Sequence, residues 1–245
     1  MIRPWLARSV ALTLAMGATA ARAEIKLAPS DNDGVIAFQL KPADLLKDEK
    51  FYQLDMSLYD PQDHLMKATS FGGWAEATDL GKGQTEETFH LIKVKPGLYV
   101  ISRLSVQGIW GLCYNKASVY FEVKPGTVTY IGELDPAPEV AAIRQAVKAR
   151  RLKSYARNGA PQTLFDDYAA PLKAPDQAAD WKTAYATYIA AKAPGLTAPV
   201  EAAELKPAHF GTGRDAFGLG RICGGYYAKA ERDGETASAA PPPKP

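Results

Sequence analysis

The chain has 245 residues, of which 47% are apolar and 23% charged, values ordinary for a globular protein and sufficient for one sizeable domain or two small ones. Its formal net charge is +2, but residues 1–23 contain three arginines and no acid. The remainder therefore carries 26 of the 29 lysines and arginines against 27 acids. Because this part of the chain is nearly neutral, its charge does not indicate a nucleic-acid partner.

Residues 1–23 have the features of a secretory signal. Arg3 and Arg8 accompany an apolar run from Val10 to Ala18, which is too short to span a bilayer. Ala21-Arg22-Ala23 then matches the small-residue cleavage pattern. An uncleaved anchor is the alternative. We expect a periplasmic or secreted protein that begins at Glu24 and has no transmembrane segment after cleavage of the signal.

Two strands are predicted early in the chain, at 35–40 and 51–59. In the second, apolar and polar residues alternate, which is the period of a half-buried strand. Tyr52, Leu54, Met56 and Leu58 are expected on one face, and Gln53, Asp55 and Ser57 on the other.

The strongest strand pattern runs from Leu91 to Leu134. Two apolar runs end in Val-Lys-Pro-Gly, at Val94–Gly97 and Val123–Gly126, and each is followed by another apolar run. Pro-Gly is typical of a tight turn, because proline presets φ near about −65° and glycine accepts a positive φ. The pattern predicts four consecutive antiparallel strands joined by two hairpins. In the second of these strands, alternation places Leu98, Val100, Leu104 and Val106 on one face.

Helical spacing begins at Asp135. Asp135-Pro136 is a typical helix start, and Val140 and Ile143 follow on one face. A short helix is predicted at 162–169 and a clearer one at 176–192, where aromatic residues recur on one face. Residues 135–230 are thus expected to form a helical extension that returns to the strands, and 231–245, with little to bury, a disordered tail.

Together these elements predict a mainly β fold. Six or seven short strands separated by turns favour an antiparallel β-sandwich of about seven strands over residues 31–134, with the helical extension C-terminal to it. A closed barrel is the alternative.

The chain has two cysteines, Cys113 and Cys223. Export to an oxidising compartment favours a disulfide between them; the alternative is two unpaired apolar residues. Closing a loop of roughly 110 residues would stabilise the fold by about 4–5 kcal/mol in the chain-entropy description. The bridge would tie the C-terminal glycine-rich segment to the loop around Cys113.

Large aromatic rings stand beside glycines in three places, and two of these flank the cysteines. Such rings could stack a sugar or anchor a partner protein; the alternative is that they pack in the interior. The predicted binding patch consists of Trp74, Trp110, Tyr114, Tyr226 and Tyr227.

No motif predicts catalysis or a bound metal. His64, His90 and His209 lie far apart and lack zinc-ligand spacing, and no nucleophile motif of the G-x-S-x-G kind occurs. Asp166-Asp167 is more typical of a solvated surface than of a catalytic carboxylate pair. The sequence therefore predicts no catalytic residues, no metal and no cofactor.

A family resemblance rests on the strand start Val94-Lys-Pro-Gly-Leu-Tyr99 and the strand ending Val128-Thr-Tyr130-Ile-Gly132. These segments resemble uncharacterised bacterial envelope proteins with a carboxypeptidase-regulatory or transthyretin-like β-sandwich, over roughly residues 34–134. The resemblance implies a non-catalytic module associated with the envelope. Many such proteins are lipoproteins, whereas this sequence has no cysteine at its predicted cleavage point.

The leading hypothesis is an exported, non-enzymatic binding or structural component of the cell envelope, with an envelope protein or glycan as partner. One alternative is a hydrolase or transferase that acts on envelope glycans. Another is an assembly subunit that docks through an exposed sheet edge. A cluster of acid and histidine in an open pocket would favour the enzyme, whereas an aromatic surface without such a cluster would favour binding.

Overall fold

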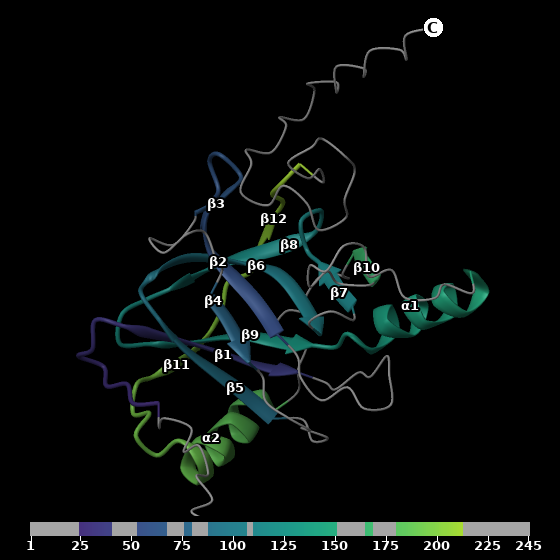
Figure 1. The fold of residues 1–245 in the computed structure, drawn as a ribbon. Coiled ribbons are helices and arrows are strands. Elements are labelled where there is room, and N and C mark those ends of the chain that lie inside the picture. Colours follow the sequence, from purple (N-terminus) through teal and green to yellow (C-terminus); the bar gives the residue numbers. More distant parts are fainter. Residues whose placement is uncertain are drawn as a thin grey trace, which may run out of the picture.

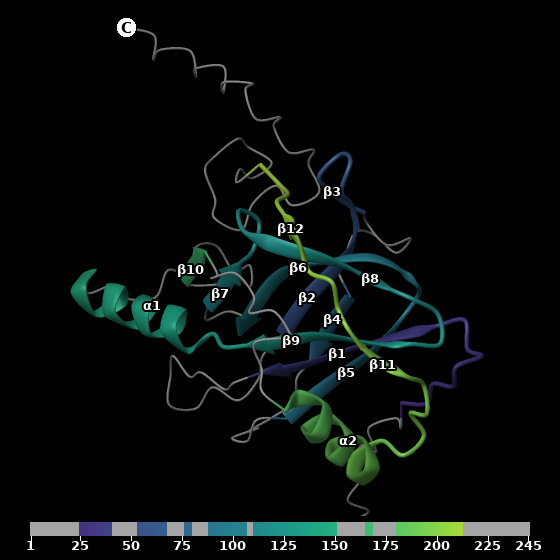
Figure 2. The same ribbon diagram turned by 180° about the vertical axis from the view of Figure 1, so that it is seen from behind.

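The computed structural model describes residues 25–40, 53–67, 76–79, 88–106, 110–150, 165–168 and 180–212. Within these ranges the fold is mainly β, with two sheets and two helices (Figures 1 and 2). In chain order the elements are β1 (Gly34–Leu40), β2 (Gln53–Asp60), β3 (Leu65–Lys67), β4 (Glu76–Asp79), β5 (Thr88–Val94), β6 (Gly97–Val106), β7 (Trp110–Cys113), β8 (Ser118–Val123), β9 (Val128–Leu134), α1 (Ala137–Arg150), β10 (Phe165–Tyr168), α2 (Trp181–Lys192), β11 (Val200–Ala202) and β12 (Lys206–Ala208).

The smaller sheet has four strands in the order β11-β9-β1-β5. The larger sheet has eight strands, and one of the two sheets curls into a half-barrel. Its main path is β10-β7-β6-β2-β3, with β4 also on β2 and with β8 joining β6 to β12. The expected all-antiparallel pairing is wrong in three places, because β9 runs parallel to β1, β11 parallel to β9, and β10 parallel to β7.

Both Pro-Gly turns carry the chain from one sheet to the other. β5 pairs with β1 in the four-stranded sheet, whereas β6 pairs with β2, β7 and β8 in the eight-stranded sheet. The second turn likewise leads from β8 to β9, which pairs with β1 and β11. The predicted hairpins are therefore wrong, although the turns are where they were expected. A tight turn reverses the chain locally but does not decide which strands become neighbours.

Strand β1 is buried along its whole length, over seven residues. Ile36 and Phe38 join a hydrophobic cluster that also contains residues of the larger sheet, such as Leu54 and Ile101. Val35, which faces the other way, belongs to a second cluster that includes side chains of α2. The apolar run from Val35 to Phe38 in β1 is explained by this position, since both faces of the strand are covered.

A β-bulge changes the expected alternation within β6. Asp55 pairs with Arg103, whereas Met56 pairs with Ile101, so that β6 has one extra residue at this point. The bulge reverses the alternation, because opposed residues share a face. Leu98 and Val100 consequently lie on the opposite face from Leu104 and Val106, which corrects the single face predicted for all four.

The C-terminal part of the chain joins both sheets. The predicted helices around Val140 and Trp181 are confirmed as α1 and α2, and α2 packs against the outer face of the four-stranded sheet (Figure 1). The helix predicted at 162–169 is wrong, since Phe165–Tyr168 forms β10, held by its ladder with β7. Because β10, β11 and β12 also belong to the sheets, the expected helical extension is not confirmed.

No helix among the described residues combines the length and apolar character needed to cross a membrane. The signal predicted at 1–23 and the tail predicted at 231–245 lie outside the described residues.

Candidate binding groove

The aromatic residues predicted to form a binding patch are not at the surface where the structure describes them. Trp110 is 0% exposed and Tyr114 is 5% exposed, and both belong to the hydrophobic cluster shared by the two sheets. Burial follows from position, because Trp110 opens β7, which is flanked by β6 on one side and β10 on the other. These two rings therefore pack in the interior, which was the alternative to a binding role. Trp74, Tyr226 and Tyr227 lie outside the described residues.

Cys113 is buried at the end of β7 and is disulfide-bonded. Cys223, the predicted partner, lies outside the described residues, so the pairing itself stays a prediction. A peptide map of the non-reduced protein tests it directly, because both thiols found free would rule out the bridge.

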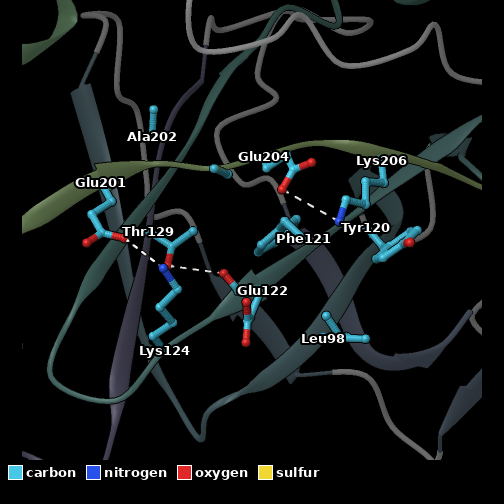
Figure 3. Close-up of a pocket in the computed structure, with 11 residues that line it drawn as sticks. Leu98, Tyr120, Phe121, Glu122, Lys124, Thr129, Glu201, Ala202, Glu204 and Lys206 are labelled. Carbon is cyan, nitrogen blue, oxygen red and sulfur yellow. Dashed lines mark hydrogen bonds and ion pairs between the residues drawn. The ribbon is translucent and has the colours of Figure 1, made fainter.

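A different surface is formed where the two sheets diverge. Residues 200–208, which we call the strap, begin as β11 on β9 of the smaller sheet and end as β12 on β8 of the larger one (Figure 2). Between the strap, β8 and β9 lies a groove with a volume of about 160 Å³ (Figure 3). One wall and the floor consist of Leu98, Tyr120, Phe121, Glu122, Lys124 and Thr129, and the strap supplies Glu201, Ala202, Ala203, Glu204 and Lys206.

Strand pairing aligns the residues on the floor. Leu98 is opposite Glu122 in the β6–β8 ladder, and Lys206 is opposite Tyr120 in the β12–β8 ladder. Since opposed residues share a face, these four side chains lie on one face of the eight-stranded sheet. Leu98 and Tyr120 are half-buried, which leaves part of an aliphatic and an aromatic surface open to the groove.

The rim carries charges of both signs. Lys124 Nζ lies 3.2 Å from Glu201 Oε2, which joins the β8–β9 turn to the strap. Lys206 Nζ lies 3.6 Å from Glu204 Oε2 within the strap itself. Such exposed pairs contribute little to stability, about 0–1 kcal/mol each. Together they place donors and acceptors around the groove (Figure 3).

Tyr120 connects the groove to a second group of aromatic residues. Its ring centroid lies 5.5 Å from that of Tyr59, on β2. The Tyr59 hydroxyl contacts His64 Nδ1 at 3.0 Å and donates to the backbone carbonyl of His209 at 2.9 Å. The His64 and His209 rings are stacked with centroids 3.9 Å apart. Burial raises the pKa of Tyr59 above its ordinary value, so the hydroxyl keeps the proton that it donates.

Neither the groove nor the histidine pair was predicted from the sequence. The groove depends on the strap returning to β8, and Tyr59 and His209 are 150 residues apart in the chain. The sequence carries only a weak signal for this arrangement: a proline such as Pro207 confines a strand to the edge of a sheet, and β12 pairs with β8 alone among the described strands.

Comparison with known proteins adds little. No family model matches the chain, and no curated protein does. A solved structure of a leucine-rich repeat protein from Bacteroides thetaiotaomicron is similar over 55% of this chain, with 11% sequence identity and a TM-score of 0.27. The match spans 19% of that protein's length, and a likeness this weak supports no conclusion about fold or function.

Proposed function

We propose that the protein is an exported, non-enzymatic component of the cell envelope that binds part of a glycan in the groove. The observation that carries this proposal is the combination of a half-buried aromatic ring, Tyr120, with a rim of carboxylates and ammonium groups. A sugar ring has an apolar face that packs on an aromatic ring, and hydroxyls that both donate and accept hydrogen bonds. The groove offers a partner for each.

The size of the groove limits what it holds. Its volume of about 160 Å³ is well below the roughly 300–1,000 Å³ typical of pockets that enclose a drug-sized ligand. A single sugar unit of a longer glycan suits this volume, with the rest of the glycan lying outside the groove.

The cellular compartment is proposed from two independent observations. The first 23 residues match a secretory signal, and disulfides persist in oxidising compartments such as the periplasm. The disulfide-bonded state of Cys113 is consistent with export.

The absence of catalysis is also part of the proposal. A glycosidase keeps one carboxyl group protonated as a general acid, usually by placing it in an apolar pocket. Glu122, Glu201 and Glu204 are all exposed, and the described residues that line the groove include no histidine or cysteine. The groove therefore favours binding over hydrolysis.

We also propose that the two sheets form a β-sandwich. Side chains of both sheets share one hydrophobic cluster, and both Pro-Gly turns cross from sheet to sheet. These features support a β-sandwich scaffold of the carboxypeptidase-regulatory or transthyretin-like kind, with the strap added at its edge.

Calorimetric titration with soluble glycan fragments prepared from bacterial envelopes tests the proposal. We expect saturable binding that is weakened at least tenfold by Tyr120→Leu, which keeps an apolar side chain but removes the ring, and by Lys124→Ala. Lys192→Ala, an exposed change at the end of α2, is the control and should bind as the unaltered protein does. Equal binding by all variants, or none with any fragment, would overturn the proposal.

A further inference from the structure

A pair of histidines is assembled by tertiary contacts at one end of the eight-stranded sheet. His64 lies in the turn between β2 and β3, and His209 directly follows β12. Their half-buried rings stack with centroids 3.9 Å apart and planes inclined by 26°. Imidazole is the most versatile transition-metal ligand among side chains, and two of them this close are a natural chelating group.

Hydrogen bonding fixes which nitrogen of His64 is available. A carbonyl oxygen only accepts, so the single proton of the Tyr59 hydroxyl is directed to the His209 carbonyl, at 2.9 Å. The contact between Tyr59 and His64 Nδ1, at 3.0 Å, must then be donated by Nδ1–H. In neutral His64 this leaves the lone pair on Nε2. Metal-binding histidines characteristically use one nitrogen for the metal and donate from the other in this way.

The backbone of His64 adds a second, independent observation. Its φ of 50° lies in the left-handed region, and among the described non-glycine residues this is shared only with Asp180. Such backbone conformations are strained for most residues and cluster at functional sites. Here the conformation holds the His64 ring beside Tyr59 and His209.

We propose that His64 and His209 bind a divalent transition-metal ion, for which Cu²⁺ is the strongest-binding probe among the common first-row ions. The ion would take Nε2 of His64 and a ring nitrogen of His209, with water completing its coordination. Chelation requires a rotation of the His209 ring, whose terminal torsion is soft. Among the described residues no group of three or more His, Cys, Asp or Glu side chains could hold a metal, so this part of the chain supplies two ligands.

A metal at this position would fasten the end of the strap to the β2–β3 turn. This end of the strap is also held by the three-residue ladder between β12 and β8, by the bond from Tyr59 to the His209 carbonyl, and by a hydrogen bond of 3.0 Å from the Phe210 N–H to the Asn115 carbonyl. Metal binding should therefore raise the thermal stability of the folded chain by mass action. This inference does not depend on the groove binding a glycan.

The test is a Cu²⁺ titration of the tag-free mature protein after treatment with a chelator, followed by calorimetry and electron paramagnetic resonance. We expect one ion per chain, with nitrogen hyperfine structure from imidazole. His64→Asn and His209→Asn should each weaken binding at least tenfold; asparagine is chosen because it tolerates the left-handed backbone at position 64. Tyr59→Phe should weaken binding by about tenfold, because His64 loses its orienting partner.

His90→Gln is the matched control, since His90 is buried and stacks on Phe38 away from the pair. It should retain the affinity, the spectrum and the metal-induced rise in melting temperature. Unchanged Cu²⁺ affinity in the double variant His64→Asn/His209→Asn would overturn the proposal. So would a spectrum without imidazole nitrogen, or the absence of any bound ion in a folded, unaltered chain.

Discussion

Tyr130 and Trp181 lie face to face, with ring centroids 4.3 Å apart and planes inclined by 22°. Tyr130 belongs to β9, and its hydroxyl donates to Gln39 Oε1 on β1 at 2.6 Å. Trp181 opens α2, which lies on the outer face of the four-stranded sheet. The stacked pair thus connects the helix to two neighbouring strands and makes α2 part of the folded core.

Replacing Trp181 by alanine should therefore destabilise the whole fold. The side chain is 7% exposed, and truncation of a buried aromatic residue costs about 3–5 kcal/mol. Urea unfolding measures the loss. Thr183→Ala, an exposed change two residues along the same helix, should stay within about 0.5 kcal/mol of the unaltered protein. Equal effects of the two changes would show that α2 does not depend on this contact.

Tyr185→Phe should leave stability unchanged or raise it by about 1 kcal/mol at neutral pH. The hydroxyl is buried and has no hydrogen-bond partner among the described residues, so removing it removes a desolvation penalty, while the ring keeps its edge-on contact with Phe89. Thermal melting at pH 7 compares the two proteins. A loss of more than about 1 kcal/mol would indicate that the hydroxyl makes a stabilising hydrogen bond, contrary to this prediction.

The same tyrosine makes stability depend on alkaline pH. Burial raises the pKa of Tyr185 from 10.0 to about 12, so the unfolded chain releases this proton before the folded chain does. Below pH 10 the tyrosine is protonated in both states, and the free energy of unfolding does not depend on its titration. As the pH rises from 10 towards about 12, the unfolded state alone loses the proton, and the free energy of unfolding falls. Denaturation across this range should be steeper for the unaltered protein than for Tyr185→Phe, and parallel curves would contradict the assignment.

Gly126→Ala tests the second Pro-Gly turn. Gly126 has a φ of 62°, and a methyl group there would collide with the carbonyl oxygen of Pro29. Backbone strain alone should lower the free energy of unfolding by about 1–3 kcal/mol, measured by chemical denaturation, and the collision should add to this loss. Gly195→Ala, at a described glycine without a positive φ, should change stability by less than about 1 kcal/mol. Similar losses at both positions would argue against the turn geometry.

Asp33→Asn tests the ion pairs that join β5 and its following turn to the start of β1. The hydrogen bond from Lys95, 2.7 Å from Asp33 Oδ1, and the nearby Lys93 hold the pKa of this carboxyl below its usual value of 3.8. A lowered pKa stabilises the fold above the unfolded-state value, and this contribution is lost as pH falls through the folded-state value.

Asp33→Asn should accordingly lower the melting temperature at pH 7, with the difference shrinking in acid and at high salt, where exposed charges are screened. A difference that persists at low pH and at high salt would mean that the carboxylate acts through something other than its charge.

The sequence allowed the strands and helices with strong local patterns to be predicted. The alternating residues of β2 and the long apolar run of β6 marked strands, and the spacing of Trp181 and Tyr185 marked the buried face of α2. In each case the information lies within a few neighbouring residues, where periodicity decides which side is buried.

What the sequence did not reveal depends on contacts between distant segments. The Pro-Gly turns look like hairpin turns, and only the pairing of β5 and β9 with β1 makes them crossings between sheets. One extra residue at the bulge reversed the predicted faces of β6. The candidate groove and the histidine pair both require the strap to return to β8, which no local pattern indicates.

The most direct test of the proposed function is chemical-shift mapping of an envelope glycan fragment on the isotope-labelled mature protein. We expect perturbations centred on the groove, at Tyr120, Lys124, Thr129 and Glu201, with α2 unaffected. Perturbations centred on α2 or elsewhere on the smaller sheet, or none at saturating fragment, would contradict binding in the groove.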